Sequence, residues 1–149
     1  MCKIFSIGFT KKKAKKFFEL LMFNKVKKLI DVRLNNSSQL AGFTKGDDLS
    51  YFLEKIAGID YVHELVFAPT KEILDLYKKG KIDWAEYEKR YIDLMRERNV
   101  YEYIKSKEKK YWAESCLLCS EEMAEKCHRR LAINVIKEVY TDFDVVHIV

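Results

Sequence analysis

The sequence KIFSIGFT, residues 3–10, combines an apolar run with a glycine and then a hydroxyl side chain. Its first six residues are typical of a buried β-strand, because aromatic and β-branched side chains suit a pleated surface. Gly8 then permits a backbone turn that a side chain would obstruct, and Thr10 is a predicted helix N-cap. Beyond Thr10, apolar side chains recur every three or four residues as far as Leu21, which predicts an amphipathic helix whose lysines face water.

The same alternation of strand and helix continues along the rest of the chain. Further strands are predicted at residues 26–32, 59–63, 111–118 and 143–149. Further helices are predicted between Asp48 and Gly58, between Pro69 and Gly80, from Asp83 to about Ile104, and across residues 131–139. Strands that alternate with helices pair in parallel through right-handed crossovers. We therefore predict a single three-layer α/β domain over residues 1–149, with a mainly parallel sheet of about five strands and helices on both faces.

The composition is that of an ordinary folded domain. The chain has 149 residues, of which 48% are hydrophobic and 34% charged, so one core can form without disulfides or metal. Its four cysteines are too few for a disulfide-stapled secreted scaffold, and free thiols in a reducing compartment are predicted instead. No segment has the pattern of a signal peptide or a membrane span. We expect a cytoplasmic protein with no membrane partner.

Polar and reactive residues gather where the predicted strands end. Residues of this kind follow the first, second and fourth strands: Gly8, Thr10, Asp31, Arg33, Asn35 and Cys119. In an open parallel sheet, ligands bind beyond the carboxyl ends of the strands, because the loops converge there and helix N-termini point positive dipoles into the crevice. The sequence therefore predicts a pocket at this edge of the sheet.

A second set of candidates comes from the start of the last predicted helix. The apolar stripe of residues 131–139, extended backwards by one turn, points Cys127 and His128 toward the strand end that carries Cys119. A helix N-terminus at this place favours the thiolate form of a cysteine. Arg129, about 100° further round the helix, is expected to reach the rim of the crevice and hold an anion. The structural alternative is that these are ordinary core residues, since cysteine and histidine are often buried without a function.

Zinc binding is a further alternative for this region. Cys116, Cys119, Cys127 and His128 count as four potential zinc ligands. In an extended strand, however, residues three apart point to opposite faces of the sheet, so one metal ion cannot easily take both Cys116 and Cys119. We therefore predict no metal ligands, and keep a structural zinc site as the lesser alternative.

The same motifs resemble the domain-of-unknown-function 488 family of small bacterial and archaeal proteins over essentially the whole chain. The resemblance is carried by Ile7-Gly8-Phe9-Thr10, by Asp31-Val32-Arg33, and by Leu117-Leu118-Cys119-Ser120-Glu121 with Cys127-His128-Arg129. Tyr61-Val62-His63 and Ala68-Pro69-Thr70 are similar to further stretches of the family. Residues 35–43 resemble one branch, whereas other branches have a loop richer in proline and arginine. The resemblance implies an α/β fold and the positions of the motifs, but no established activity.

The leading functional hypothesis is a pocket that binds or processes an anionic small molecule or a nucleotide. The residues predicted to act as nucleophile, acid or base are Cys119, Glu121 and His128. The residues predicted to bind the substrate are Gly8, Thr10, Asp31, Arg33, Asn35, Cys127 and Arg129. Asp31 is expected to orient Arg33, and both Arg33 and Arg129 are expected to hold the anionic group.

Two other interpretations remain open from the sequence. A nucleic-acid-binding module without catalysis is suggested by the net charge of +5 and by the polar loop at residues 34–47. In the other interpretation, Arg33, Glu121 and Arg129 form a structural ion network that binds no ligand. Whether the protein is an enzyme, which cofactor it uses and whether it self-associates are all left open by the sequence.

Overall fold

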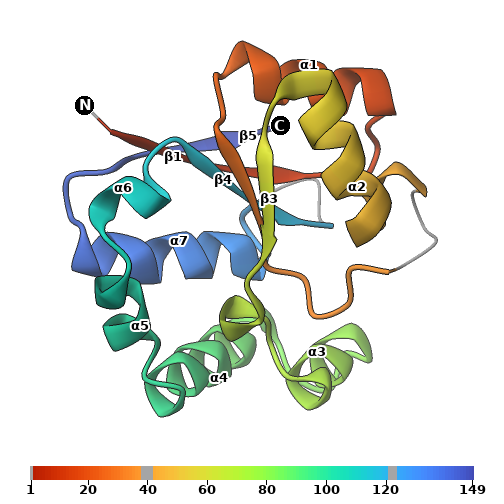
Figure 1. Cartoon of the computed structure of the whole chain (residues 1–149). Helices are drawn as coiled ribbons and strands as arrows, with labels where there is room; N and C mark the ends of the chain where they lie inside the picture. The colour runs from red at the N-terminus through yellow and green to blue at the C-terminus, as the bar shows by residue number, and fades with distance from the viewer. Residues whose placement is uncertain (1, 38–41, 121–123) are drawn as a thin grey trace.

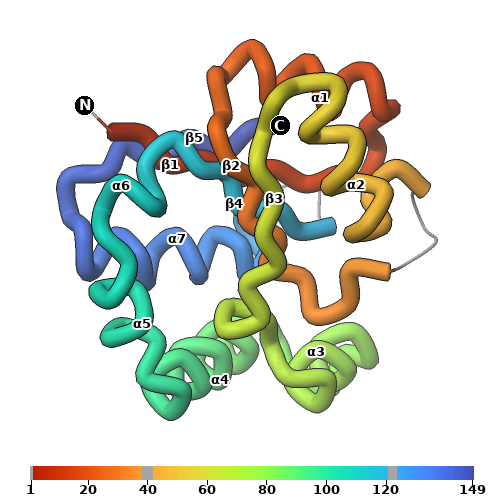
Figure 2. The backbone as a smooth tube through the Cα atoms, in the orientation of Figure 1, coloured from red at the N-terminus to blue at the C-terminus, as the bar shows by residue number. Residues whose placement is uncertain are grey.

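The computed structural model describes residues 2–37, 42–120 and 124–149, and its centre is one five-stranded sheet (Figure 1). The strands are β1 (Lys3–Gly8), β2 (Lys28–Asp31), β3 (Asp60–His63), β4 (Ser115–Cys119) and β5 (Asp144–Ile148). They lie in the order β3-β2-β4-β1-β5, and every neighbouring pair is parallel. The first and last strands of the chain therefore lie side by side, as the backbone trace shows (Figure 2).

Helices cover both faces of this sheet. They are α1 (Ala14–Phe23), α2 (Gly46–Phe52), α3 (Lys71–Lys78), α4 (Trp84–Glu97), α5 (Val100–Ser106), α6 (Lys109–Trp112) and α7 (His128–Val139). Short helical turns lie at Gly42–Thr44, Leu53–Ala57 and Leu65–Phe67. α1 and α2 lie on one face and α7 on the other, with α4 and α5 packed against α7 (Figure 1). The predicted α/β fold, with a parallel sheet between two helical layers, is confirmed.

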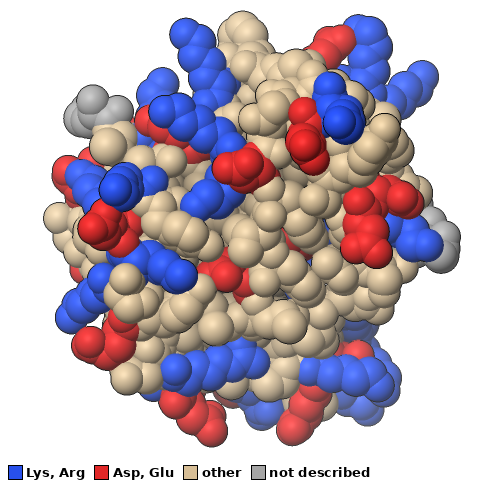
Figure 3. Space-filling model, viewed as in Figure 1, with Lys and Arg blue, Asp and Glu red and all other residues tan. Residues whose placement is uncertain are grey.

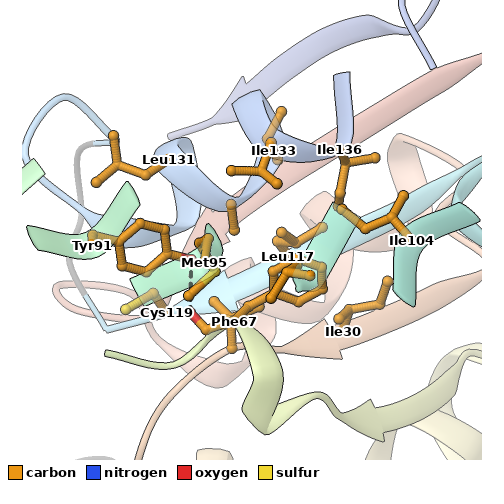
Figure 4. Packing of buried hydrophobic residues seen from close by; sticks show 14 of the residues in the cluster. Ile30, Phe67, Tyr91, Met95, Ile104, Leu117, Cys119, Leu131, Ile133 and Ile136 are labelled. Atoms are coloured by element: carbon orange, nitrogen blue, oxygen red, sulfur yellow. Dashed lines mark hydrogen bonds between the residues drawn. The ribbon is translucent and has the colours of Figure 1, made fainter. Parts of the chain in front are cut away.

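Each face of the sheet has its own apolar core. Successive residues of β4 alternate between the two faces, so Leu117 packs in the core under α7 and Leu118 in the core under α1. Figure 4 shows the first core, where Tyr91 and Met95 of α4 lie close to Leu117 and to α7. The Tyr91 hydroxyl donates to the carbonyl oxygen of Phe67 at 2.7 Å, which satisfies the polar end of a fully buried ring.

The helix predicted from Asp83 to Ile104 is wrong in one respect, because it is two helices. Asp83 caps α4 as its pattern indicates, with its carboxylate accepting from the backbone N–H of Glu86 at 2.9 Å. The break comes at Asn99, whose φ of 58° is left-handed and ends the helical hydrogen bonding between α4 and α5. α4 is the longest described helix, with 14 residues, and none of the described helices is both long and apolar enough to span a bilayer.

Three other predicted element boundaries are also wrong. Residues 109–112 form α6, so β4 begins at Ser115 and not at residue 111. The N-cap of α1 is Lys13, because the Thr10 hydroxyl donates to the carbonyl oxygen of Ser120 and does not cap a helix. Asp48 lies in the first turn of α2, one turn after its N-cap.

Candidate functional site

Four parts of the chain meet at the carboxyl edge of the sheet: the ends of β1, β2 and β4 and the start of α7. The backbone N–H of Val32, just after β2, donates to the carbonyl oxygen of Leu118 in β4 at 3.1 Å. The backbone N–H of Thr10, after β1, donates to the carbonyl oxygen of Ser120 at 3.0 Å. The imidazole Nε2 of His128 lies 2.7 Å from the carbonyl oxygen of Val32, which ties the start of α7 to the end of β2. The expected proximity of the Asp-Val-Arg and Cys-His segments is confirmed.

Asp31 and Arg33 form a buried, two-pronged ion pair at this edge. Arg33 Nε donates to one carboxylate oxygen of Asp31 at 2.9 Å, and Nη2 donates to the other at 2.8 Å. The two side chains can meet because residues two apart in an extended chain point to the same side. Burial by itself lowers the pKa of Arg33, but the hydrogen bond and the charge of Asp31 outweigh that effect and raise it. The guanidinium group therefore stays charged and fixed in direction.

Two neighbours that the sequence analysis did not identify complete the surroundings of this pair. The Tyr61 hydroxyl on β3 donates to Asp31 at 2.6 Å, and burial together with the Asp31 charge raises the pKa of Tyr61. The carbonyl oxygen of Thr44 accepts a second bond from Arg33 Nη2 at 2.6 Å. A backbone carbonyl leaves no signal in a sequence, whereas Tyr61 lies in one of the stretches that carry the family resemblance.

One donor of Arg33 is left over. The Arg33 side chain is only 5% exposed, yet its Nη1 atom is buried and has no hydrogen-bond partner among the described residues. The Phe9 ring lies 5.4 Å from the guanidinium carbon and offers a π-face but no conventional acceptor. A buried donor without a partner costs free energy, so such a group in a native structure calls for a ligand or a water to satisfy it.

Beside this pair lies a cluster of two thiols and an imidazole. The sulfur of Cys119 is 3.5 Å from Nδ1 of His128 and 3.8 Å from Nε2. The ligand atoms of Cys119, Cys127 and His128 all lie within 4.8 Å of one another, and the three side chains are 4%, 3% and 6% exposed. A carbonyl oxygen can only accept, so the bond to Val32 requires the proton on Nε2, and in the neutral ring Nδ1 of His128 is then the acceptor.

Cys127 and Cys116, the two cysteines on either side of Cys119 in the sequence, have different environments. A hydrogen bond to Cys119 raises the pKa of Cys127, and burial raises it further. Cys127 is the N-cap residue of α7, a 12-residue helix, so it lies at the positive end of the helix dipole. Cys116 belongs to the core on the other face of the sheet, where burial raises its pKa. The prediction that Cys116 and Cys119 point to opposite faces is confirmed.

The other predicted binding residues do not form part of this cluster. Arg129 was expected at the rim of the crevice, and this is wrong: its side chain is fully buried, and Nε donates to the Ser6 hydroxyl in the middle of β1 at 3.1 Å. Asn35 is exposed, and its side-chain oxygen accepts from the backbone and the hydroxyl of Ser37. Gly8 is buried opposite Cys119 in the β1–β4 register. Glu121 lies outside the residues that the structure describes.

The surface has two hollows of note, and residues outside the cluster line both of them. The smaller, of about 220 Å³, is bordered by Asn36, Lys45 and Asp47. Its Asn36 amide donates to the Tyr61 hydroxyl at 3.0 Å, which connects the hollow to Asp31 through one hydrogen-bonded side chain. Arg33 and Cys119 line neither this hollow nor the larger one beside α1.

Together, the fold and the edge cluster define a class: an α/β domain with an aspartate–arginine pair and a Cys-Cys-His cluster at the carboxyl ends of a parallel sheet. Within that class, the chain belongs to the family described as Domain of unknown function DUF488, whose family model matches residues 13–136. The match includes both segments that form the cluster, and it confirms the resemblance seen in the motifs. No curated protein and no solved structure matches the chain.

Proposed function

We propose that this DUF488 protein binds and processes an anionic small molecule, of the nucleotide or phosphorylated-metabolite class, at the carboxyl edge of its sheet. The observation that carries this proposal is the buried Nη1 of Arg33, which has no partner among the described residues. A phosphate or carboxylate oxygen is the acceptor that a guanidinium group binds best. Because Asp31 already fixes the other side of the guanidinium, Arg33 would bind the anion without losing side-chain freedom.

The reactive groups on the same edge are the Cys119 thiol and the His128 imidazole, which contacts the residue before Arg33. Nδ1 of His128 accepts the thiol proton, and the thiolate attacks the phosphorus atom of the bound phosphate ester. An S–P bond forms as the bond from phosphorus to the leaving oxygen breaks, and the imidazolium ion returns its proton to that oxygen. The Val32 carbonyl oxygen keeps the proton on Nε2 and stabilises the imidazolium ion that forms. A nucleophile, a base and a group that orients the base are the parts that such chemistry requires.

The test is a thermal-shift measurement with inorganic phosphate and with nucleotides, on the native chain and on Arg33→Lys. A ligand that binds only the folded state must raise the melting temperature. We expect Arg33→Lys to lower the affinity about 10- to 100-fold, because a charged hydrogen bond contributes about 1.5–3 kcal/mol and lysine lacks the planar fork. Arg90→Lys is the matched control, since Arg90 pairs with Glu86 on the exposed side of α4. Equal shifts in the native chain and in Arg33→Lys would contradict the proposal.

A second candidate function, nucleic-acid binding, is favoured by one surface feature. A hollow of about 520 Å³ beside α1 is lined by Lys13, Lys15, Lys16 and the Phe23 ring, which is 82% exposed. Lysines beside an exposed aromatic ring can hold a phosphate backbone and stack a base. On the face that Figure 3 shows, however, basic and acidic side chains are interspersed. The small-molecule function therefore remains the better supported of the two.

A further inference from the structure

Three side chains of the edge cluster are donors of the types that zinc prefers. Cys119 ends β4, and Cys127 and His128 begin α7, so strand and helix together bring two sulfurs and one nitrogen within 4.8 Å of one another. In a tetrahedral zinc site, with Zn–S near 2.3 Å and Zn–N near 2.0 Å, a sulfur and a nitrogen ligand lie about 3.5 Å apart. The distance of 3.5 Å between Cys119 Sγ and His128 Nδ1 already has this value.

The surroundings of His128 also suit a metal ligand. A histidine that binds a metal usually donates its other ring N–H to a carbonyl or carboxylate oxygen, which fixes the tautomer. His128 makes this contact through Nε2 to the Val32 carbonyl oxygen at 2.7 Å, and Nδ1 is the nitrogen that faces Cys119. The bond to Val32 therefore favours the tautomer in which Nδ1 can bind a metal.

The charges of the cluster are compatible with a buried ion. Two thiolates cancel the charge of one Zn²⁺, so the loaded cluster carries no net charge at a place where the three side chains are at most 6% exposed. Cys127 is the N-cap residue of α7, where the helix dipole favours negative charge. Cys116 cannot supply a fourth sulfur because it packs in the core on the other face. Three protein ligands leave a fourth position for a water or for an oxygen of the ligand, as in catalytic zinc sites.

We propose that Cys119, Cys127 and His128 bind one Zn²⁺ ion, and that the bound ion controls the reactivity of Cys119. Binding releases the protons of the two thiols and converts Cys119 from a nucleophile into a metal ligand. The second part rests on the proposed function, because only a nucleophilic Cys119 has a reactivity to control. The first part, metal binding, holds or fails without it.

The experiment titrates Zn²⁺ into reduced, chelator-washed protein in competition with a chromophoric chelator. We expect one equivalent to bind to the native chain and to Cys116→Ser, which removes a thiol from the same strand but from the opposite face. Loss of a group that only hydrogen-bonds to a metal ligand lowers metal affinity about 10- to 100-fold. Cys127→Ser removes a ligand itself, so it should lower the zinc affinity by more than this. His128→Asn is the second ligand variant, and it serves if Cys127→Ser does not fold. Absence of zinc binding in the native chain, or equal losses in Cys116→Ser and Cys127→Ser, would overturn the proposal.

Alkylation by iodoacetamide, located by mass spectrometry, tests on the same samples whether bound zinc controls the reactivity of Cys119. Cys119 should react in the metal-free chain and be protected by one equivalent of Zn²⁺, whereas Cys127→Ser should react equally with and without zinc. If zinc binds but Cys119 does not react in the metal-free chain, the nucleophilic role fails and the metal site stands. If Cys119 reacts and zinc gives no protection, the metal proposal fails and the proposed function stands.

Discussion

At the scale of single residues, Ser6 links two basic side chains through one hydroxyl. Arg129 Nε donates to the Ser6 oxygen at 3.1 Å, so the Ser6 hydroxyl hydrogen is available to Nδ1 of His147, which lies 2.6 Å away. This arrangement requires a neutral His147 that accepts the hydrogen bond. Burial lowers the pKa of His147, and the charges of Arg129 and Arg130 lower it further. The hydrogen-bonded chain therefore holds His147 in its neutral form.

This arrangement predicts a loss of stability on acidification. The pKa of His147 is lower in the folded chain than its unfolded value of about 6.5. The contribution of His147 to the free energy of unfolding is therefore fully present above pH 6.5. It is lost as the pH falls from 6.5 through the pKa of His147 in the folded chain. Urea unfolding between pH 8 and pH 5 should show the decline, and His147→Gln should flatten that part of the curve. An unchanged profile in His147→Gln would assign the decline to other groups.

At the scale of elements, the break between α4 and α5 depends on one backbone conformation. Asn99 is exposed and has φ 58° and ψ 42°, a left-handed geometry that asparagine adopts more readily than residues other than glycine. Its side chain makes no cap hydrogen bond to α5, so the conformation is its main contribution to this corner. The corner lets Val100 and Ile104 turn into the core beside α7.

We expect substitutions at Asn99 to follow backbone preference and not side-chain chemistry. Asn99→Ala should destabilise the fold by about 1 kcal/mol, because alanine adopts the left-handed region less readily than asparagine does. Asn99→Gly should be neutral or slightly stabilising, since glycine adopts this region freely. Chemical denaturation of both variants gives the comparison. Equal destabilisation by alanine and glycine would indicate that the asparagine side chain matters.

The same corner explains which elements could be predicted from sequence. The apolar spacing of residues 84–104 stays helical across Asn99, so periodicity alone could not locate the break. Asp83 was recognisable as a cap, because its carboxylate acts within three residues of its own position. Thr10 fits the same cap pattern, but its hydroxyl is used by Ser120, which is 110 residues away in the sequence. Local signals were reliable where no distant partner competed for the same side chain.

At the scale of the whole molecule, topology determined which candidate residues meet. Parallel strands end at one edge, so Cys119 and Asp31 could be expected to be neighbours once the strands were recognised. The order β3-β2-β4-β1-β5 places β4 between β2 and β1, which puts Cys119 at the centre of that edge. The position of Arg129 could not be predicted in the same way. Arg129 follows His128 in α7, and the rotation of the helix over this one residue points the Arg129 side chain toward Ser6 in the middle of β1, away from the carboxyl edge.

The topology also separates the two candidate binding sites in space, because α1 packs on the face of the sheet opposite to α7. Lys13 and Lys16 are exposed beside the α1 hollow, whereas Arg33 is buried at the carboxyl edge. We expect the double variant Lys13→Glu and Lys16→Glu to retain the phosphate-induced thermal shift in full, because charges on an exposed helix are screened within about 10 Å at 0.1 M salt. Any binding of a single-stranded oligonucleotide should fall steeply with rising salt in the native chain and be lost in this variant.

Arg33→Lys should give the reverse result, with oligonucleotide binding unchanged and the phosphate shift reduced. Fluorescence anisotropy and thermal shift on the three proteins, each at two salt concentrations, distinguish the two surfaces. Loss of the phosphate shift in the double variant Lys13→Glu and Lys16→Glu would mean that the anion binds at α1. In that case the donor left over on Arg33 would belong to the ion network that holds β2 against Thr44, and the carboxyl edge would have a structural role only.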